Sequence, residues 1–77
     1  MFINLTTKVL NLNHVMEFKR IEDFTEADYG VEFTMTDGSK RYIFYDNIGV
    51  REKVYSNLLN ILKTKDTLIE ETTLLES

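Results

Sequence analysis

Apolar and polar residues alternate between residues 29 and 45, and this alternation predicts a β-hairpin. One face of the first arm holds Tyr29, Val31, Phe33 and Met35. A period of two residues is typical of a half-buried antiparallel strand. Asp37-Gly38 separates the arms, and this pair favours a tight two-residue turn of the primed type. On the return arm one face holds Tyr42 and Phe44, and the other holds Arg41, Ile43 and Tyr45.

The spacing of apolar residues changes to three and four directly after the hairpin, which predicts an amphipathic helix over residues 48 to 64. The stripe consists of Val50, Val54, Leu58, Ile61 and Leu62, widened by Tyr55 and Leu59. Asp46 or Asn47 can cap the first turn by accepting from its free backbone N–H groups. We expect this stripe to cover one face of the sheet.

Shorter strand patterns precede the hairpin. Residues 2–5 and 9–12 read as two short strands around a turn, or as one bent strand. Residues 15–24 read as a longer strand in which the apolar positions shift register, so a bulge is expected near Lys19-Arg20. The predicted fold is α+β: an antiparallel sheet of four or five strands, packed on one face by a single C-terminal amphipathic helix.

The last twelve residues differ in character from the rest. Residues 1–65 form the predicted single domain, and residues 66–77 form an acidic tail that also carries Leu68, Ile69, Leu74 and Leu75. Four exposed large aliphatic side chains in so short a segment would be unusual. A second short helix, or a segment that orders against another protomer, both account for them.

Composition narrows the classes of function. The 77 residues include no cysteine, and no apolar run reaches the roughly 18 residues of a membrane span. With no leader pattern at residues 1–8, a cytoplasmic protein is expected. Residues 1–65 carry nine basic and nine acidic residues, so the whole net charge of −4 comes from the tail. This distribution disfavours nucleic acid, because phosphate binding needs a surplus of cations.

The sequence offers little support for an enzyme. His14 is the single histidine, and no Ser, Cys or second His accompanies it at a useful spacing. Glu22, Asp23, Glu26 and Asp28 lack the pattern of a calcium loop and fit a solvated turn. We therefore predict no catalytic residue, no metal site and no cofactor.

The aromatic residues of the hairpin admit two interpretations. In so small a chain they are needed for the core or for an interface with a second subunit. Alternatively, Tyr42 and Phe44 with Lys40 and Arg41 are the ingredients of a sheet surface that stacks single-stranded nucleic acid. Core or interface is the favoured interpretation.

Three segments of the chain form a pattern: Phe2-Ile-Asn-Leu-Thr6, then Leu10-Asn-Leu-Asn13 leading to Met16-Glu-Phe18, then Thr36-Asp-Gly-Ser-Lys-Arg-Tyr42 before a helix. Together they resemble the FlbD-like family of short bacterial flagellar proteins. The resemblance covers about residues 2–62 and implies a fold, since its motifs are turn and core residues. The chain departs from the family at Asp46-Asn-Ile-Gly49 and in its acidic tail, and we transfer no flagellar role.

The hypothesis that fits best is a small non-catalytic interaction or regulatory accessory protein of bacterial, phage or mobile-element type. We expect it to form a homo-oligomer and to bind a protein partner, with no membrane involved. Its candidate surface comprises Tyr42, Phe44, Tyr45, Leu68, Ile69, Leu74 and Leu75. The alternatives are a single-stranded nucleic-acid module using Lys40, Arg41, Tyr42 and Phe44, or an acidic inhibitor that mimics nucleic acid or sequesters a ligand.

Overall fold

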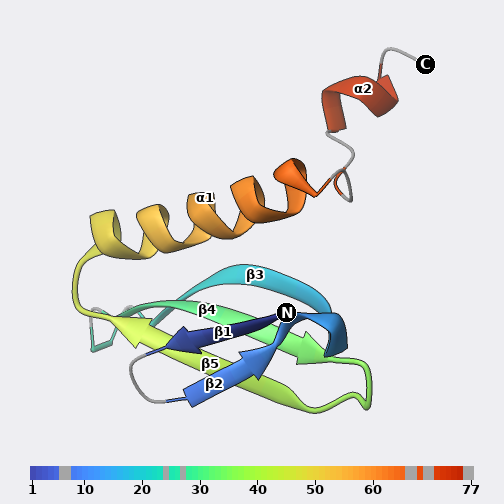
Figure 1. The fold of residues 1–77 in the computed structure, drawn as a ribbon. Helices are drawn as coiled ribbons and strands as arrows, with labels where there is room; N and C mark the ends of the chain where they lie inside the picture. The colour runs from blue at the N-terminus through green and yellow to red at the C-terminus, as the bar shows by residue number, and fades with distance from the viewer. Residues whose placement is uncertain (6–7, 24, 27, 66–67, 69–70, 76–77) are drawn as a thin grey trace.

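A computed structural model gives the fold of residues 1–5, 8–23, 25–26, 28–65, 68 and 71–75 (Figure 1). Over these residues the elements run in the order β1 (Phe2–Leu5), β2 (Lys8–Asn11), a 3₁₀ turn η1 (Leu12–His14), β3 (Val15–Asp23), β4 (Asp28–Met35), β5 (Lys40–Tyr45), α1 (Ile48–Thr64) and α2 (Glu71–Leu75). Phe24 and Ala27, which the strand and turn predictions include, lie outside the described residues.

The chain is α+β, as the sequence predicts, but its strands form two antiparallel sheets. β3, β4 and β5 make a three-stranded sheet with β4 in the middle, and β1 pairs with β2 in a separate hairpin. The turn η1 separates the two sheets, and the Asn11 side chain supports it by accepting from the Asn13 backbone N–H at 3.0 Å. The predicted single sheet of four or five strands is therefore wrong, because this turn directs the hairpin onto the face of the larger sheet.

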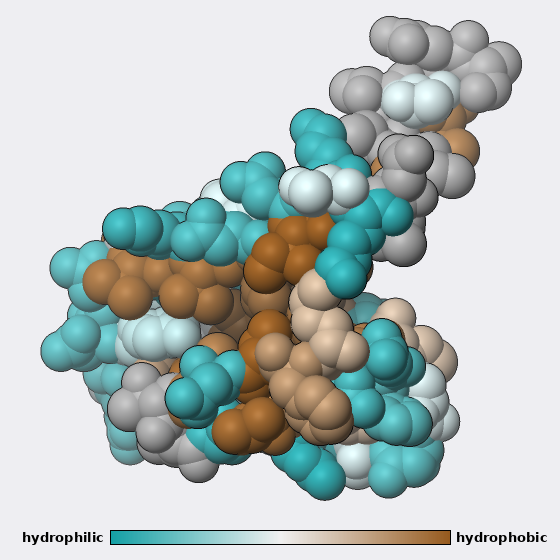
Figure 2. Space-filling view, viewed as in Figure 1, coloured by the Kyte–Doolittle hydropathy of each residue, from teal (hydrophilic) through white to brown (hydrophobic). Residues whose placement is uncertain are grey.

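The core lies between the larger sheet, α1 and the β1–β2 hairpin. Its buried apolar residues are Leu10, Val31, Phe33, Ile43 and Leu58. α1 and the hairpin cover the same face of the sheet (Figure 1), and apolar side chains gather between them (Figure 2). We call this the inner face. No other element covers the opposite, outer face in the described part of the chain.

The loop between β4 and β5 is longer than predicted. The Met35 N–H donates to the Ser39 carbonyl at 2.8 Å, and the Gly38 N–H donates to the Met35 carbonyl at 2.9 Å. Three residues therefore lie inside the loop, and the two-residue primed turn is wrong. Gly38 adopts a φ of 89°, and its lack of a side chain makes that left-handed conformation accessible. Thr36 and Asp37 are the central residues of the turn that the Gly38 N–H closes, and Gly38 is the additional loop residue. The Asp37 side chain accepts from the Ser39 N–H at 2.8 Å.

The bulge in β3 lies nearer its start than predicted. Pairing with β4 shifts between Val15 and Glu17, so Met16 is the extra residue. Pairing is then regular through to Asp23, which contradicts a bulge at Lys19-Arg20. The sequence pattern misleads because the apolar side chains after the bulge do not share a face: Phe18 lies on the inner face and Ile21 on the outer face.

α1 follows the Asn47 cap, whose side-chain oxygen accepts from the backbone N–H groups of Gly49 at 2.7 Å and Val50 at 3.2 Å. In the first turn of α1, the buried residue is not the one that the predicted apolar stripe contains. Val50 is 46% exposed, whereas Arg51 is 2% exposed and occupies the position toward the sheet. The buried side of the helix thus begins with a charged residue and continues to Leu58.

The Arg51 guanidinium joins α1 to two strands of the larger sheet. It donates to the backbone carbonyls of Ile21 at 3.0 Å and Gly30 at 3.3 Å. It also pairs with the carboxylates of Glu22 at 3.0 Å and Glu52 at 2.8 Å. Because each bond to the buried charge comes from a fixed direction, together they set the position of the helix on the sheet.

Arg20 adds a second connection between β3 and α1. Its Nε donates to both carboxylate oxygens of Glu52 at 2.9 and 3.1 Å, and its guanidinium carbon lies 3.9 Å from the centre of the Tyr55 ring. The hydrogen bond from Arg20 is the main reason that the pKa of Glu52 lies below its ordinary value, with a smaller contribution from Arg51. Glu52 therefore stabilises the fold most strongly when it is ionised.

α2 stands away from the body of the molecule, beyond the end of α1 (Figure 1). None of the helices in the described part of the chain has the length and apolar character needed to cross a membrane.

Arg51→Ala should lower the free energy of unfolding by about 2–5 kcal/mol, since it removes a buried side chain together with its hydrogen bonds to the Ile21 and Gly30 carbonyls. Urea unfolding followed by circular dichroism measures the change. Lys53→Ala, an exposed residue on the same helix, is the matched control and should stay within about 0.5 kcal/mol of the wild type. Equal losses in the two variants would contradict the structural role of Arg51.

Glu52→Gln should reduce stability at neutral pH and matter less in acid. A carboxyl whose folded pKa is lowered contributes stability above its unfolded pKa, near 4.5, and loses that contribution as the pH falls through the folded pKa. The difference in melting temperature between wild type and variant should therefore shrink between pH 7 and pH values below 4.5. A difference that stays constant over this range would show that the charge of Glu52 is unimportant.

Candidate functional site

The outer face of the larger sheet is built from alternate residues of its three strands. Cross-strand pairing places Glu17, Thr34 and Lys40 in one row, Lys19, Glu32 and Tyr42 in the next, and Ile21, Gly30 and Phe44 in the third. Directly opposite residues share a face and contact one another. The outer face thus combines two aromatic rings with a group of charged side chains.

Tyr42 and Phe44 form an exposed aromatic pair. Their ring centres are 6.2 Å apart and their planes differ by 13°, so the rings lie nearly parallel. Tyr42 is 39% exposed and Phe44 is 48% exposed. We refer to these two residues as the aromatic pair.

Gly30 allows Phe44 to lie flat against the central strand. A Cβ atom at Gly30 would come within 2.8 to 2.9 Å of the Phe44 ring and 2.9 Å of the Ile43 carbonyl oxygen. Such distances are too short for ordinary contacts, so the ring occupies the space that any other residue would need. An aromatic ring that covers a glycine in this way holds the two strands together.

A buried carboxylate lies beside the aromatic pair. Glu32 is 8% exposed, and its Oε2 lies 3.2 Å from the ammonium of Lys19 and 3.8 Å from that of Lys40. Burial by itself raises the pKa of this carboxyl, but the two ammonium groups outweigh that effect and hold the pKa below its ordinary value. Glu32 is therefore the counter-ion of both lysines.

Two residues predicted for the surface lie elsewhere on the sheet. Tyr45 is opposite Tyr29, on the inner face, and packs against the core. Arg41 is opposite Phe33, so it also projects from the inner side, and it donates to the Lys40 carbonyl at 3.1 Å. The structure thus separates Tyr45 and Arg41 from the aromatic pair, because successive residues of a strand point to opposite faces.

The tail residues predicted for the surface are far from the aromatic pair along the chain and are described in part. Leu74 and Leu75 lie in α2 and are 63% and 77% exposed. Leu68 is half-buried. Ile69 lies outside the described residues.

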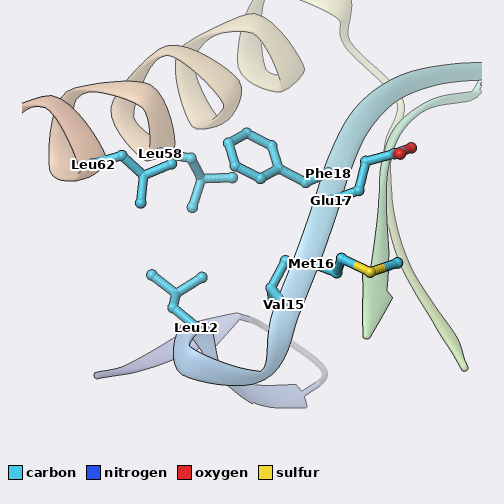
Figure 3. Close-up of a pocket in the computed structure, with 7 residues that line it drawn as sticks. All are labelled: Leu12, Val15, Met16, Glu17, Phe18, Leu58 and Leu62. Atoms are coloured by element: carbon cyan, nitrogen blue, oxygen red, sulfur yellow. The ribbon is translucent and has the colours of Figure 1, made fainter. Parts of the chain in front are cut away.

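An apolar hollow lies between β3, η1 and the second half of α1. Its volume is about 110 Å³, and it is bordered by Leu12, Val15, Met16, Glu17, Phe18, Leu58 and Leu62. Figure 3 shows that the Glu17 carboxylate and the Met16 side chain point away from the aliphatic and aromatic groups that face the space. This hollow can hold a small apolar group but offers no polar group to orient a reaction. A wider, open hollow lies where Met1 meets the end of α1.

Of the polar residues considered for chemistry, the side chains of Glu22 and Asp23 have partners within the fold. Within the described part of the chain, no three His, Cys, Asp or Glu side chains are close enough to hold a metal ion. Glu22 pairs with Arg51, and Asp23 accepts from the backbone N–H of Thr25 at 3.0 Å. The backbone carbonyl of His14 accepts from the Thr36 N–H at 2.8 Å.

Sequence reasoning missed Lys19, Glu32 and Gly30 as parts of this surface. Each lies directly across from, or one strand beyond, a member of the aromatic pair. The register of the hairpin is the signal that could have identified them. The predicted two-residue turn gives a different register from the observed three-residue loop.

No family model matches the chain, and no curated protein or solved structure is significantly similar to it.

Gly30→Ala should destabilise the fold by about 1–3 kcal/mol, because the new methyl group overlaps the Phe44 ring and the Ile43 carbonyl. Adding Phe44→Ala removes the first overlap, so the double variant should lose less stability than the two single variants together. Urea unfolding of all four proteins measures the coupling. Strictly additive losses would mean that the ring does not lie over Gly30.

Proposed function

We propose that this chain is a small non-catalytic protein-interaction module that binds through the outer face of its three-stranded sheet. In this proposal it is a homo-oligomeric accessory protein of a bacterium, phage or mobile element and acts in the cytoplasm. The observation that carries the proposal is the exposed aromatic pair on a sheet face that no other described element covers.

The chemistry of the pair supports binding to protein. Aromatic side chains are enriched at the energetic centres of protein interfaces, because they bury large areas with little loss of conformational freedom. The backing of the pair is rigid: Phe44 lies on Gly30, and Tyr42 lies beside the buried Glu32. A rigid apolar centre with charged residues around it is the arrangement expected of a binding surface.

Single-stranded nucleic acid is the second candidate, favoured by the nearly parallel rings on an open sheet. Bases stack on such rings, and lysines nearby would meet the phosphates. Glu32 argues against this candidate, because its carboxylate pairs with both Lys19 and Lys40. Glu17, in the same row as Lys40, balances the remaining positive charge. Arg41, the remaining cation of the predicted set, projects from the inner side of the sheet.

Light scattering at matched concentrations tests the proposal. The wild type should have a molar mass above the 9.1 kDa of one chain, and Tyr42→Ser combined with Phe44→Ser should reduce it to 9.1 kDa. Val50→Ser is the control, since Val50 is similarly exposed but lies on α1, across the sheet from the outer face. An assembly that survives in the double variant would contradict the proposed surface.

The same proteins distinguish the second candidate. A fluorescent single-stranded oligonucleotide at low salt should show no binding that depends on the aromatic pair. Binding by the wild type that is lost in the double variant, and that weakens steeply with added salt, would instead identify a nucleic-acid surface.

A further inference from the structure

β5 lies at one edge of the larger sheet, and this edge carries backbone groups that β4 does not use (Figure 1). We propose that β5 of a second copy pairs antiparallel with this free edge, so that the two sheets join and the aromatic pairs of both copies lie side by side. This inference rests on the proposed function and names the partner, a second copy of this chain held strand to strand.

Every second residue of β5 turns its backbone N–H and carbonyl away from β4. The Met35 N–H donates to the Ser39 carbonyl, and in an antiparallel ladder the bonded pairs recur at every second residue from there. The bonds to β4 therefore come from Arg41, Ile43 and Tyr45. The groups that face the free edge belong to Lys40, Tyr42 and Phe44. A row of unpaired backbone groups is a template for another strand.

Two carbonyls of the free edge are held by cationic side chains of the same chain. Lys8 donates to the Tyr42 carbonyl, and Arg41 donates to the Lys40 carbonyl at 3.1 Å. These contacts agree with the direction that the ladder gives to both carbonyls. Side-chain cations at a sheet edge compete with strand pairing. Association therefore requires the backbone N–H groups of the second copy to displace these side chains, and Lys8 opposes it.

One register of two β5 strands is self-complementary. When Ile43 lies opposite Ile43 of the second copy, the inner faces and the outer faces of the two sheets coincide. The free-edge groups of Tyr42 then meet those of Phe44 in the second copy, and the two rings lie opposite each other on the outer face. Aromatic pairs across neighbouring strands stabilise a sheet. Twofold symmetry makes this contact twice.

Charge selects the same register. It places Lys40 opposite Asp46 of the second copy, again twice, and Asp46 is an exposed residue directly after β5. The neighbouring registers that keep the faces aligned are centred on Tyr42 or on Phe44, and neither brings Lys40 opposite Asp46. A second copy thus supplies an opposite charge and an aromatic ring at the positions where β5 needs them.

The other edge of the sheet, β3, is less suited to a second copy. Its charged side chains already have partners on α1, since Arg20 pairs with Glu52 and Glu22 pairs with Arg51. The aromatic pair lies on β5, so pairing at the β5 edge is what brings the rings of two copies together.

Charge reversal in the full chain tests the register. Lys40→Asp and Asp46→Lys, each made alone, should raise the dissociation constant of the dimer by about tenfold, because two like-charged pairs replace two oppositely charged pairs. An equimolar mixture of the two variants should recover the affinity of the wild type, since each changed residue then faces the changed residue of the other copy. Light scattering over a dilution series measures all three.

Removal of the competing ammonium provides a second readout. Lys8→Ala should lower the dissociation constant by about fivefold, because it frees the Tyr42 carbonyl for an N–H of the second copy. Lys53→Ala removes the same charge from the exposed side of α1 and should leave the dissociation constant unchanged. A Lys8→Ala variant that associates no more tightly than this control would contradict pairing at the Tyr42 carbonyl.

The outcomes separate this inference from the proposed function. Charge-reversal variants that associate as tightly as the wild type would overturn the strand pairing, as would weakened variants that do not recover when mixed. In both cases loss of assembly on combining Tyr42→Ser with Phe44→Ser would leave the proposed function standing. Recovery in the mixture, with an assembly that survives that double variant, would support the pairing and contradict the proposed surface. A wild type of 9.1 kDa would contradict both.

Discussion

The buried guanidinium of Arg51 is the interaction on which the arrangement of this small protein depends. It connects the first turn of α1 with the backbone of β3 and β4, through carbonyl groups that are fixed by the sheet itself. Once these bonds form, the rotation of α1 is determined, and Leu58 two turns later points into the core. A side chain with five donors in a rigid plane suits this role better than an apolar residue, which packs without a required direction.

Gly30 links this buried interaction to the exposed surface. Its carbonyl accepts from Arg51 on the inner side of the sheet, and its missing side chain makes room for the Phe44 ring on the outer side. Because both contacts involve one residue of the central strand, a change in how α1 sits on the sheet would also move the strand beneath the aromatic pair.

The sequence predicts local structure well here and the assembly of strands poorly. Alternation in the hairpin and the Asn47 cap are local signals, and the structure places β4, β5 and the start of α1 accordingly. The separate β1–β2 hairpin depends on packing between distant residues, which a pattern of spacings does not contain. Sequence reasoning does not place Arg51 on the buried side of α1, because a helical stripe is recognised by its apolar residues. Arg51 nevertheless has the right spacing, three residues before Val54 and seven before Leu58.

Glu32 decides what kind of ligand the outer face can attract. Without a carboxylate between them, Lys19 and Lys40 would make the area around Tyr42 strongly positive and suited to phosphates. With Glu32 beside them, both ammonium groups are already paired, and long-range attraction for a polyanion is reduced. In the proposed function, short-range contacts with the rings would then dominate the free energy of binding. A ligand with few charges and exposed aliphatic side chains gains most from such a surface, and this describes a protein segment better than a nucleic acid.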